Sequence, residues 1–321
     1  MTEKTGDAPD GAAAIGDSKR TYYDRSTSTF LPLAPIRSVA PAYISKANET
    51  PVLLSEPRKL LVILDLNGTV LHRDGAPKRT ITPRPYLDDL LRYLFVSCRV
   101  MVWSSARPES VSAMLKRCFG AMQFRLDRVW SRDHFKLHEI DYQRKVLTLK
   151  DLEEVWEVYA NEDQEKEASS LAHESNKGGR GTGPRASQGV FDQTNTILID
   201  DSVHKTQLQP FNRLVLPNFH RERAQSGNDV ELLKVMKYIE QLTRQQNVSS
   251  FVRLHPFESE NDEYASESFV SETTTHFQDY INNEKKDRIR LRRIWRKERQ
   301  RAREGLLPSR ETEAEPTIDE Q

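Results

Sequence analysis

The amino-acid sequence predicts an α/β domain built on a doubly wound, mainly parallel sheet. Short uninterrupted apolar runs, such as residues 60–64, are typical of strands that are buried on both faces of a parallel sheet. Between these runs lie segments whose apolar residues recur every three or four positions, the spacing of an amphipathic helix. Strands that alternate with helices over roughly residues 58–245 indicate a doubly wound fold.

The predicted elements follow one another as repeated strand–helix units. The apolar runs predict four buried strands, over residues 60–64, 99–105, 195–201 and 212–219. The helical spacing predicts three helices, over residues 84–95, 107–120 and 228–242. Pro85 and Pro108 suit the first turns of the first two helices, and Gly120 suits the end of the second.

The regions around the domain differ from it in composition. Residues 1–57 are rich in Ala, Ser, Thr and Pro, and we expect a disordered N-terminal tail. Inside the domain, residues 161–190 hold five of the thirteen glycines and almost no apolar residue, which predicts a disordered surface insertion. Residues 246–321 are first acidic and then basic, and we expect a largely disordered or helical C-terminal tail.

The charge balance restricts the kinds of partner. The chain has 48 basic and 48 acidic side chains, so only local clusters can attract nucleic acid or acidic membranes. Residues 285–303 form such a cluster, with eleven Lys or Arg and two acids. A solvated helical tail, a patch for an import receptor or nucleic acid, and contact with an acidic partner are all open readings.

Cysteine content and hydropathy indicate the compartment. Two cysteines, Cys98 and Cys118, favour a reduced intracellular protein over a disulfide framework or a zinc site. No apolar stretch approaches the roughly 18 residues of a membrane helix. The acidic N-terminal segment lacks the features of a secretory signal or a mitochondrial presequence. We therefore expect the nucleus or the cytoplasm, with the mitochondrion as the less favoured alternative.

Polar side chains stand where the predicted buried segments end. They are Asp65 with Asn67, Ser104, Lys150, and the pair Asp200 and Asp201. The carboxyl ends of parallel strands meet at one sheet edge, where open α/β folds bind their ligands. Each feature alone has an ordinary explanation, since Asn67 before Gly68 favours a turn and Lys150 could be a solvated lysine. Their common position at segment ends favours a single site.

These residue types suit phosphoryl transfer through an aspartyl intermediate. A carboxylate can attack phosphorus and form a covalent intermediate. A hydroxyl and an ammonium group can hold the phosphate oxygens and offset their charge. A further carboxylate completes an oxygen shell for Mg²⁺, which binds few protein ligands.

The motif "DLNGTV", residues 65–70, resembles the DxxGT signature of the haloacid-dehalogenase superfamily. More narrowly, residues 58–245 resemble the catalytic domain of the RNA polymerase II C-terminal-domain phosphatases, the NLI-interacting-factor-like family. The matching stretches are "KLLVILDLNGTVLHR", "PRPYLDDLLRYL", "VMVWSSARPESV", "LTLKDLEEV" and "ILIDDSVHKTQLQPFN". Four motifs in order over nearly two hundred residues form a specific signal.

This resemblance implies a haloacid-dehalogenase-like Rossmannoid fold and a role for each motif residue. Asp65 resembles the nucleophile that forms the aspartyl phosphate. The phosphate-binding residues would be Thr69, Ser104 and Lys150. Mg²⁺ would be held by Asp65, the backbone carbonyl of Asn67, Asp200 and Asp201.

Motif spacing adds an inference about the substrate. Ser104 lies only 39 positions after Asp65, and the residues between them must hold a flap, residues 72–83, and a helix. That leaves no room for a large cap domain, so an open site favours a phosphorylated protein segment over a small metabolite. Ser104 and Lys150 are 46 residues apart, and by resemblance we expect residues 124–147 to form a small sheet beside the site.

Asn67 departs from the family pattern, which has a second Asp there as general acid and base. An amide cannot exchange a proton, and loss of a positioned acid–base costs about 10²- to 10⁴-fold in rate. The first hypothesis is therefore a Mg²⁺-dependent protein phosphatase-like domain with weakened catalysis. The alternative is a non-enzymatic adaptor or binding module of the same fold, such as the related subunit of the mitochondrial inner-membrane import translocase.

Overall fold

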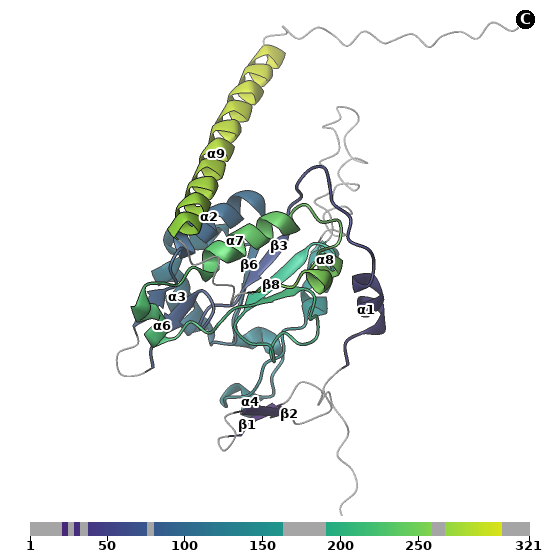
Figure 1. Cartoon of the computed structure of the whole chain (residues 1–321), viewed down its shortest axis with the longest axis vertical. Coiled ribbons are helices and arrows are strands. Elements are labelled where there is room, and N and C mark those ends of the chain that lie inside the picture. Colours follow the sequence, from purple (N-terminus) through teal and green to yellow (C-terminus); the bar gives the residue numbers. More distant parts are fainter. Residues whose placement is uncertain are drawn as a thin grey trace, which may run out of the picture. The chain divides into compact units, whose positions relative to one another are not determined.

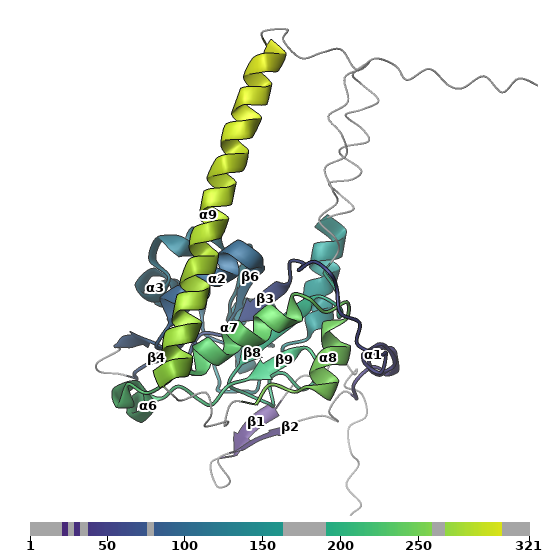
Figure 2. The same ribbon diagram turned by 45° about the horizontal axis from the view of Figure 1, so that its top comes forward.

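The computed structural model describes residues 21–24, 29–32, 38–75, 80–162, 191–258 and 267–303 of the 321-residue chain. The chain divides into two compact units, Met1–Thr274 and Thr275–Gln321, and each is described by itself. Figures 1 and 2 show the strands of the larger unit's central sheet with helices beside them.

The central sheet of the larger unit has five parallel strands in the order β7-β6-β3-β8-β9. The strands are β3 (Leu61–Leu64), β6 (Arg99–Trp103), β7 (Arg128–Trp130), β8 (Thr196–Asp200) and β9 (Arg213–Val215). The chain first builds outward from β3 through β6 to β7 and then crosses to place β8 on the other side of β3. The strand order thus reverses between β3 and β8, where doubly wound folds bind their ligands. The predicted fold class is confirmed.

Burial on both faces explains the apolar runs in the sequence. Every residue of β3 and of β8 is buried. One sheet face forms a continuous core, and its members include Leu61, Ile63, Met101, Trp103, Trp130, Leu152, Val155 and Leu198. The rings of Trp103 and Trp130 meet edge to face, with centroids 5.0 Å apart. Strands with alternating polarity would leave polar groups inside this two-sided core.

The three predicted helices are present as α2 (Leu87–Ser97), α3 (Pro108–Cys118) and α7 (Glu231–Leu242). Helix α2 contacts both β6 and α7. Shorter helical segments connect the main elements, namely η2 (Gly120–Arg125), η3 (Arg132–Phe135), α4 (Glu139–Tyr142) and α6 (Arg221–Ser226). A further helix occupies residues 152–162.

A small antiparallel hairpin follows the first motif, made of β4 (Leu71–Arg73) and β5 (Ile81–Pro83). Its tip, residues 76–79, lies outside the described residues. The prediction of a separate small sheet over residues 124–147 was wrong. In that segment β7 joins the main sheet as an edge strand, and η3 and α4 follow it, because Trp130 and Phe135 pack into the core.

The N-terminal region differs from the expected disordered tail over 1–57 in the part that the structure describes. Helix α1 (Pro41–Ala47) packs on α8 (Val248–Leu254), and the two lie side by side in Figures 1 and 2. The buried hydroxyl of Tyr43 donates to Asn212 Oδ1 at 2.9 Å, a contact between residues far apart in sequence. Seven helical residues give too short a periodic pattern to be recognised from sequence. Strands β1 (Thr21–Asp24) and β2 (Thr29–Pro32) pair antiparallel, and residues 1–20, 25–28 and 33–37 lie outside the description.

The C-terminal boundary of the packed domain also lies further along than residue 245. Helix α8 buries Val248 and Val252, and the side chain of Asn247 caps it by accepting from Ser249 N and Ser250 N. The predicted insertion falls almost wholly on residues 163–190, which lie outside the described residues. Helix α9 (Glu267–Arg303) contains the basic cluster. Of the helices that the structure describes, none is both long enough and apolar enough to cross a membrane.

Candidate active site

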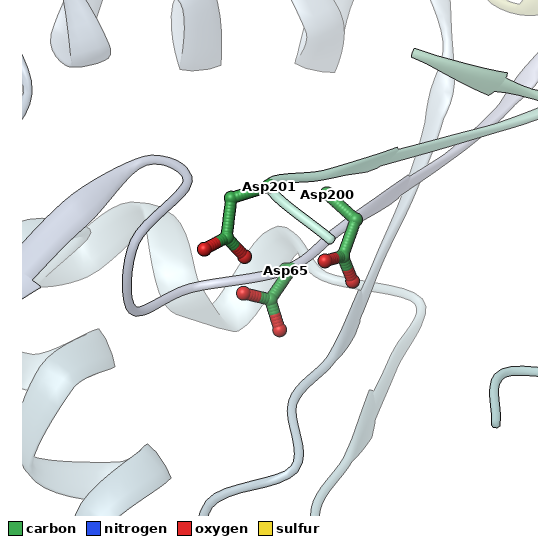
Figure 3. A group of neighbouring side chains, drawn as sticks. All are labelled: Asp65, Asp200 and Asp201. Atoms are coloured by element: carbon green, nitrogen blue, oxygen red, sulfur yellow. The ribbon is translucent and has the colours of Figure 1, made fainter. Parts of the chain in front are cut away.

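Three carboxylates converge at the carboxyl ends of β3 and β8. Asp65 follows β3, and Asp200 ends β8, with Asp201 next in the chain. Parallel pairing aligns the two ends, since Leu64 is opposite Ile199 and Asp65 N donates to Ile199 O at 2.9 Å. One carboxylate oxygen from each of the three acids lies within 4.8 Å of the others. Figure 3 shows the three side chains directed toward one another.

Lys150 brings a positive charge into this cluster. Its side chain is fully buried, and Nζ donates to Asp65 Oδ1 at 2.8 Å and to Asp200 Oδ2 at 2.5 Å. A buried ammonium group is tolerated only where charged and hydrogen-bonded partners offset its desolvation. Lys150 therefore fixes the two carboxylates relative to each other, and a phosphate oxygen at this point would meet a preorganised cation.

The loop after Asp65 explains the Gly-Thr pair of the motif. Thr69 is buried, and its hydroxyl donates to Asp65 Oδ2 at 3.2 Å and lies 3.4 Å from Asp201 Oδ1. Gly68 has a φ of +93°, a left-handed value that favours glycine. A Cβ atom on Gly68 would lie 2.6 Å from Asp201 Oδ2 and 2.8 Å from Asn218 Nδ2. Only glycine lets the loop approach the carboxylates this closely.

Ser104 lies at the same edge of the sheet, just after β6. Its position follows from the pairing of Leu64 with Val102, two residues before it. The side chain is buried, its Oγ accepts from Ala106 N at 3.3 Å, and its backbone N donates to Trp130 O at 2.9 Å. The hydroxyl thus has a local bond to the turn that starts α3, and it occupies the strand end where the motif predicts a phosphate-binding group.

Asn67 differs from the other motif residues because its side chain is exposed. Its Oδ1 accepts a hydrogen bond from Arg73 N at 2.7 Å, which ties the motif loop to strand β4. An aspartate carboxylate could accept the same bond. The substitution is therefore compatible with the loop structure, and its chemical consequence is the missing acidic proton.

Sequence reasoning missed two cations that the fold brings to the site. Lys205 Nζ lies 3.8 Å from Asp200 Oδ1 and 3.8 Å from Asp201 Oδ1. Its position four residues after Asp201 is the signal that could have suggested it. Arg84 is fully buried and supports the loop, since its guanidinium donates to Thr69 O at 2.8 Å.

Burial and the lysines set the ionisation of the acids. Burial opposes ionisation of Asp200, but the ammonium groups of Lys150 and Lys205 outweigh it and hold the pKa of Asp200 below its usual value. Burial, reinforced by the charges of Asp65 and Asp200, raises the pKa of Asp201 to about 6 although Lys205 acts in the opposite direction. The neighbouring carboxylates outweigh burial at Lys205 and raise the pKa of its ammonium group.

The donor set fits a divalent cation. With three carboxylates ionised and two ammonium groups present, the cluster has one net negative charge in a buried setting. Mg²⁺ prefers oxygen ligands and is held by one or two carboxylates together with water and phosphate. Asp65, Asp200 and Asp201 would hold it, with the backbone carbonyl of Asn67 as the further ligand that the motif predicts.

Comparisons with known proteins identify relatives of this chain. Residues 60–249 match the family model described as NLI interacting factor-like phosphatase. An uncharacterized FCP1 homology domain-containing protein of Schizosaccharomyces pombe is 35% identical over 208 residues, which cover 61% of this chain and 77% of that protein.

More distant relatives include two proteins named ubiquitin-like domain-containing CTD phosphatase 1. The Xenopus tropicalis protein is 21% identical over 63% of this chain, and the Drosophila melanogaster protein is 22% identical over 59%. The match spans 56% and 51% of their own lengths, about half of each. A solved structure of a variant of the fission yeast RNA polymerase II CTD phosphatase Fcp1, bound to beryllium fluoride, aligns with a TM-score of 0.31 at 13% identity, over 77% of this chain and 67% of that one.

Proposed function

Because the chain belongs to the NLI interacting factor-like phosphatase family, we propose that it is a Mg²⁺-dependent protein phosphatase-like domain with catalysis weakened at Asn67. The observation that carries this proposal is the buried contact of Lys150 with Asp65 and Asp200, beside Asp201 and Thr69. This arrangement places a carboxylate nucleophile next to a fixed cation. The proposed substrate is a phosphorylated protein segment.

The proposed reaction has two displacement steps at Asp65. In the first, a carboxylate oxygen bonds to phosphorus, the bond from phosphorus to the substrate oxygen breaks, and that oxygen must gain a proton. In the second, water attacks the aspartyl phosphate, loses a proton, and releases inorganic phosphate and free Asp65. Lys150, Ser104 and Thr69 would hold the phosphate oxygens. When bound, Mg²⁺ supplies further positive charge against those oxygens.

Asn67 would limit both proton transfers. Its amide has no proton to give to the departing oxygen and cannot take one from the attacking water. The expected cost is about 10²- to 10⁴-fold in rate. The remaining groups of the site still position phosphate and offset its charge, so slow turnover is the expected state.

The chain around the site favours an extended substrate. Between Asp65 and Ser104, the residues that the structure describes form the hairpin β4–β5, helix α2 and strand β6 of the central sheet. No element among them adds a cap large enough to enclose a metabolite. The names of the two CTD phosphatase relatives agree with a protein substrate.

A second candidate is a non-enzymatic binding module, and Lys205 is the observation that favours it. Its ammonium group already offsets part of the charge of Asp200 and Asp201, so the site is less dependent on a metal. One such module is an adaptor like the related subunit of the mitochondrial inner-membrane import translocase. We propose the nucleus or cytoplasm as the location, and a mitochondrial pattern of the tagged protein would favour the adaptor instead.

Magnesium is expected to raise the melting temperature of the protein, whether or not it turns over phosphate. A ligand that binds only the native state stabilises it by mass action, by about 2.7 kcal/mol at one hundred times its dissociation constant. Thermal melts with and without millimolar Mg²⁺ measure this. Asp200→Asn, which keeps the shape of the side chain, should abolish most of the shift.

Two further conditions make this test specific for the carboxylate cluster. Lys205→Met removes a competing cation and should increase the Mg²⁺-induced shift. Metal binding needs ionised ligands, so the shift should shrink as the pH falls through about 6, where Asp201 becomes protonated. A wild-type protein that shows no shift in melting temperature would contradict the metal site and support the adaptor.

Residual phosphatase activity is expected to favour substrates whose departing oxygen needs little protonation. The phenol of tyrosine has a pKa of about 10, so its phenolate can depart with little protonation. A serine alkoxide is far more basic and needs a proton donor. Initial rates on phosphotyrosine and phosphoserine versions of one peptide compare the two, with Asp65→Asn as the inactive control. Faster hydrolysis of the phosphoserine peptide would show that another group supplies the proton.

A further inference from the structure

The basic cluster of the second unit presents an ordered stripe of charge. Helix α9 is continuous in Figures 1 and 2, and Lys286, Arg290, Arg293 and Lys297 all have exposed side chains on it. Their spacings of four, three and four residues place them on one face of an α-helix. At 1.5 Å per residue the stripe is about 16 Å long.

The stripe lies on the opposite side of α9 from its buried side chains. Phe277 and Ile281 are each only 1% exposed. At about 100° per residue, these two positions fall roughly 180–220° around the helix from Lys286, whereas the rest of the stripe stays within about 40° of it. The four cations thus lie on the face of α9 opposite to Phe277 and Ile281.

The net charge of residues 285–303 is opposite in sign to that of the rest of the chain. Residues 285–303 have eleven basic and two acidic side chains, a net charge of +9. The other residues hold 37 Lys or Arg and 46 Asp or Glu, a net charge of −9. Charge complementarity therefore exists on α9 while the remaining chain as a whole repels the same ligand.

We propose that this stripe, residues 286–297 of α9, binds the phosphate backbone of double-stranded DNA. One strand of a duplex carries a phosphate about every 3.4 Å along its axis, so the stripe spans about five phosphates. A helix of about 10–12 Å diameter fits the major groove of B-form DNA, about 12 Å wide, but not the deep, narrow groove of duplex RNA. The contact is to the backbone and is independent of base sequence.

The stripe is less suited to an anionic membrane. An interfacial helix buries an apolar face beside its cations, and the four positions of the stripe are all charged. Among the described apolar side chains beyond Ile281, only Ile289 is near the stripe. Among the side chains that the structure describes on this part of α9, charged groups thus outnumber apolar ones beside the stripe, which favours a soluble polyanion.

The test is fluorescence anisotropy of the full chain with a labelled DNA duplex of about 20 base pairs, from about 50 to 200 mM salt. The stripe variant combines Lys286→Gln, Arg290→Gln, Arg293→Gln and Lys297→Gln. It should weaken binding at least about tenfold and reduce the slope of log affinity against log salt by about 3.6, since each phosphate contact contributes about 0.9. Glutamine keeps a high helix propensity, and circular dichroism verifies that the helix remains.

A matched control removes the same amount of charge from the larger unit. It combines Lys46→Gln, Lys116→Gln, Arg117→Gln and Lys136→Gln, four exposed cations, and its affinity should stay within about twofold of wild type. Exchanging Lys and Arg within the stripe should also preserve binding, because the contact depends on charge. Equal losses in the two glutamine variants, no DNA binding by wild type, equal or tighter binding of an RNA duplex, or stripe-dependent binding to anionic vesicles in preference to DNA would each overturn the proposal.

Discussion

Replacing Arg84 with methionine is expected to lower the free energy of unfolding by about 3 kcal/mol. Arg84 forms two hydrogen bonds of 2.9 Å to the carboxylate of Asp229, and both side chains are fully buried. Breaking such a pair typically costs about 3–5 kcal/mol because one charge stays buried without its partner. The lower end applies, since Arg223 still contacts Asp229 at 2.5 Å. Urea unfolding of the two proteins measures the difference.

A surface ion pair of the same residue types provides the control. Arg92 contacts Asp88 at 2.5 Å, four residues earlier on α2, but both side chains are about half exposed. Arg92→Met should therefore cost no more than about 0.5 kcal/mol. If the two variants lose similar stability, burial is not what makes the Arg84 pair strong. Since Arg84 also donates to Thr69 O, its loss should reduce the Mg²⁺-induced shift as well, while Arg92→Met leaves that shift unchanged.

The sequence was sufficient for the parts of the fold that carry strong periodic or apolar patterns. Residues 60–64 and 195–201 lie on strands that are buried on both faces, so their composition is unambiguous. The motif residues Asp65, Asp200 and Asp201 converge because parallel strands align their carboxyl ends. The sequence shows that these residues stand at the ends of buried strands. For parallel strands, that position determines that the residues lie close together in the fold.

The missed features depend on contacts between distant segments. Arg84 and Asp229 are 145 residues apart, and neither stands in a pattern that predicts a partner. Helix α1 is stabilised by Tyr43, whose bond to Asn212 spans 169 residues. Strand β7 has only three residues and one partner, so it leaves no recognisable alternation. Such features become visible only when the chain is folded.

Restoring the acid at the second motif position is expected to increase phosphatase turnover by about 10²-fold or more. This is the usual contribution of a positioned general acid–base, and Asn67→Asp supplies it in a nearly isosteric side chain. The structure accommodates the change, because the side chain is exposed and its Oδ1 already accepts from Arg73 N at 2.7 Å. A carboxylate keeps that bond and needs little desolvation. Turnover of an aryl phosphate with Mg²⁺ present measures the gain.

Three controls make the outcome decisive. Asn67→Ala should match or fall below wild type, since it adds no acid, and Asp65→Asn in the Asn67→Asp background should abolish turnover. Spontaneous deamidation of Asn67 could mimic the gain, so intact mass must accompany each rate. That reaction needs Gly68 N to attack the amide carbon, but Gly68 N donates to Leu71 O at 2.8 Å, which should keep the native loop from deamidating quickly.

If Asn67→Asp stays inactive while Mg²⁺ still raises its melting temperature, the missing proton is not the defect. The phosphate pocket at Ser104 and Lys150 would then be the block, and the adaptor would become the better account of this chain.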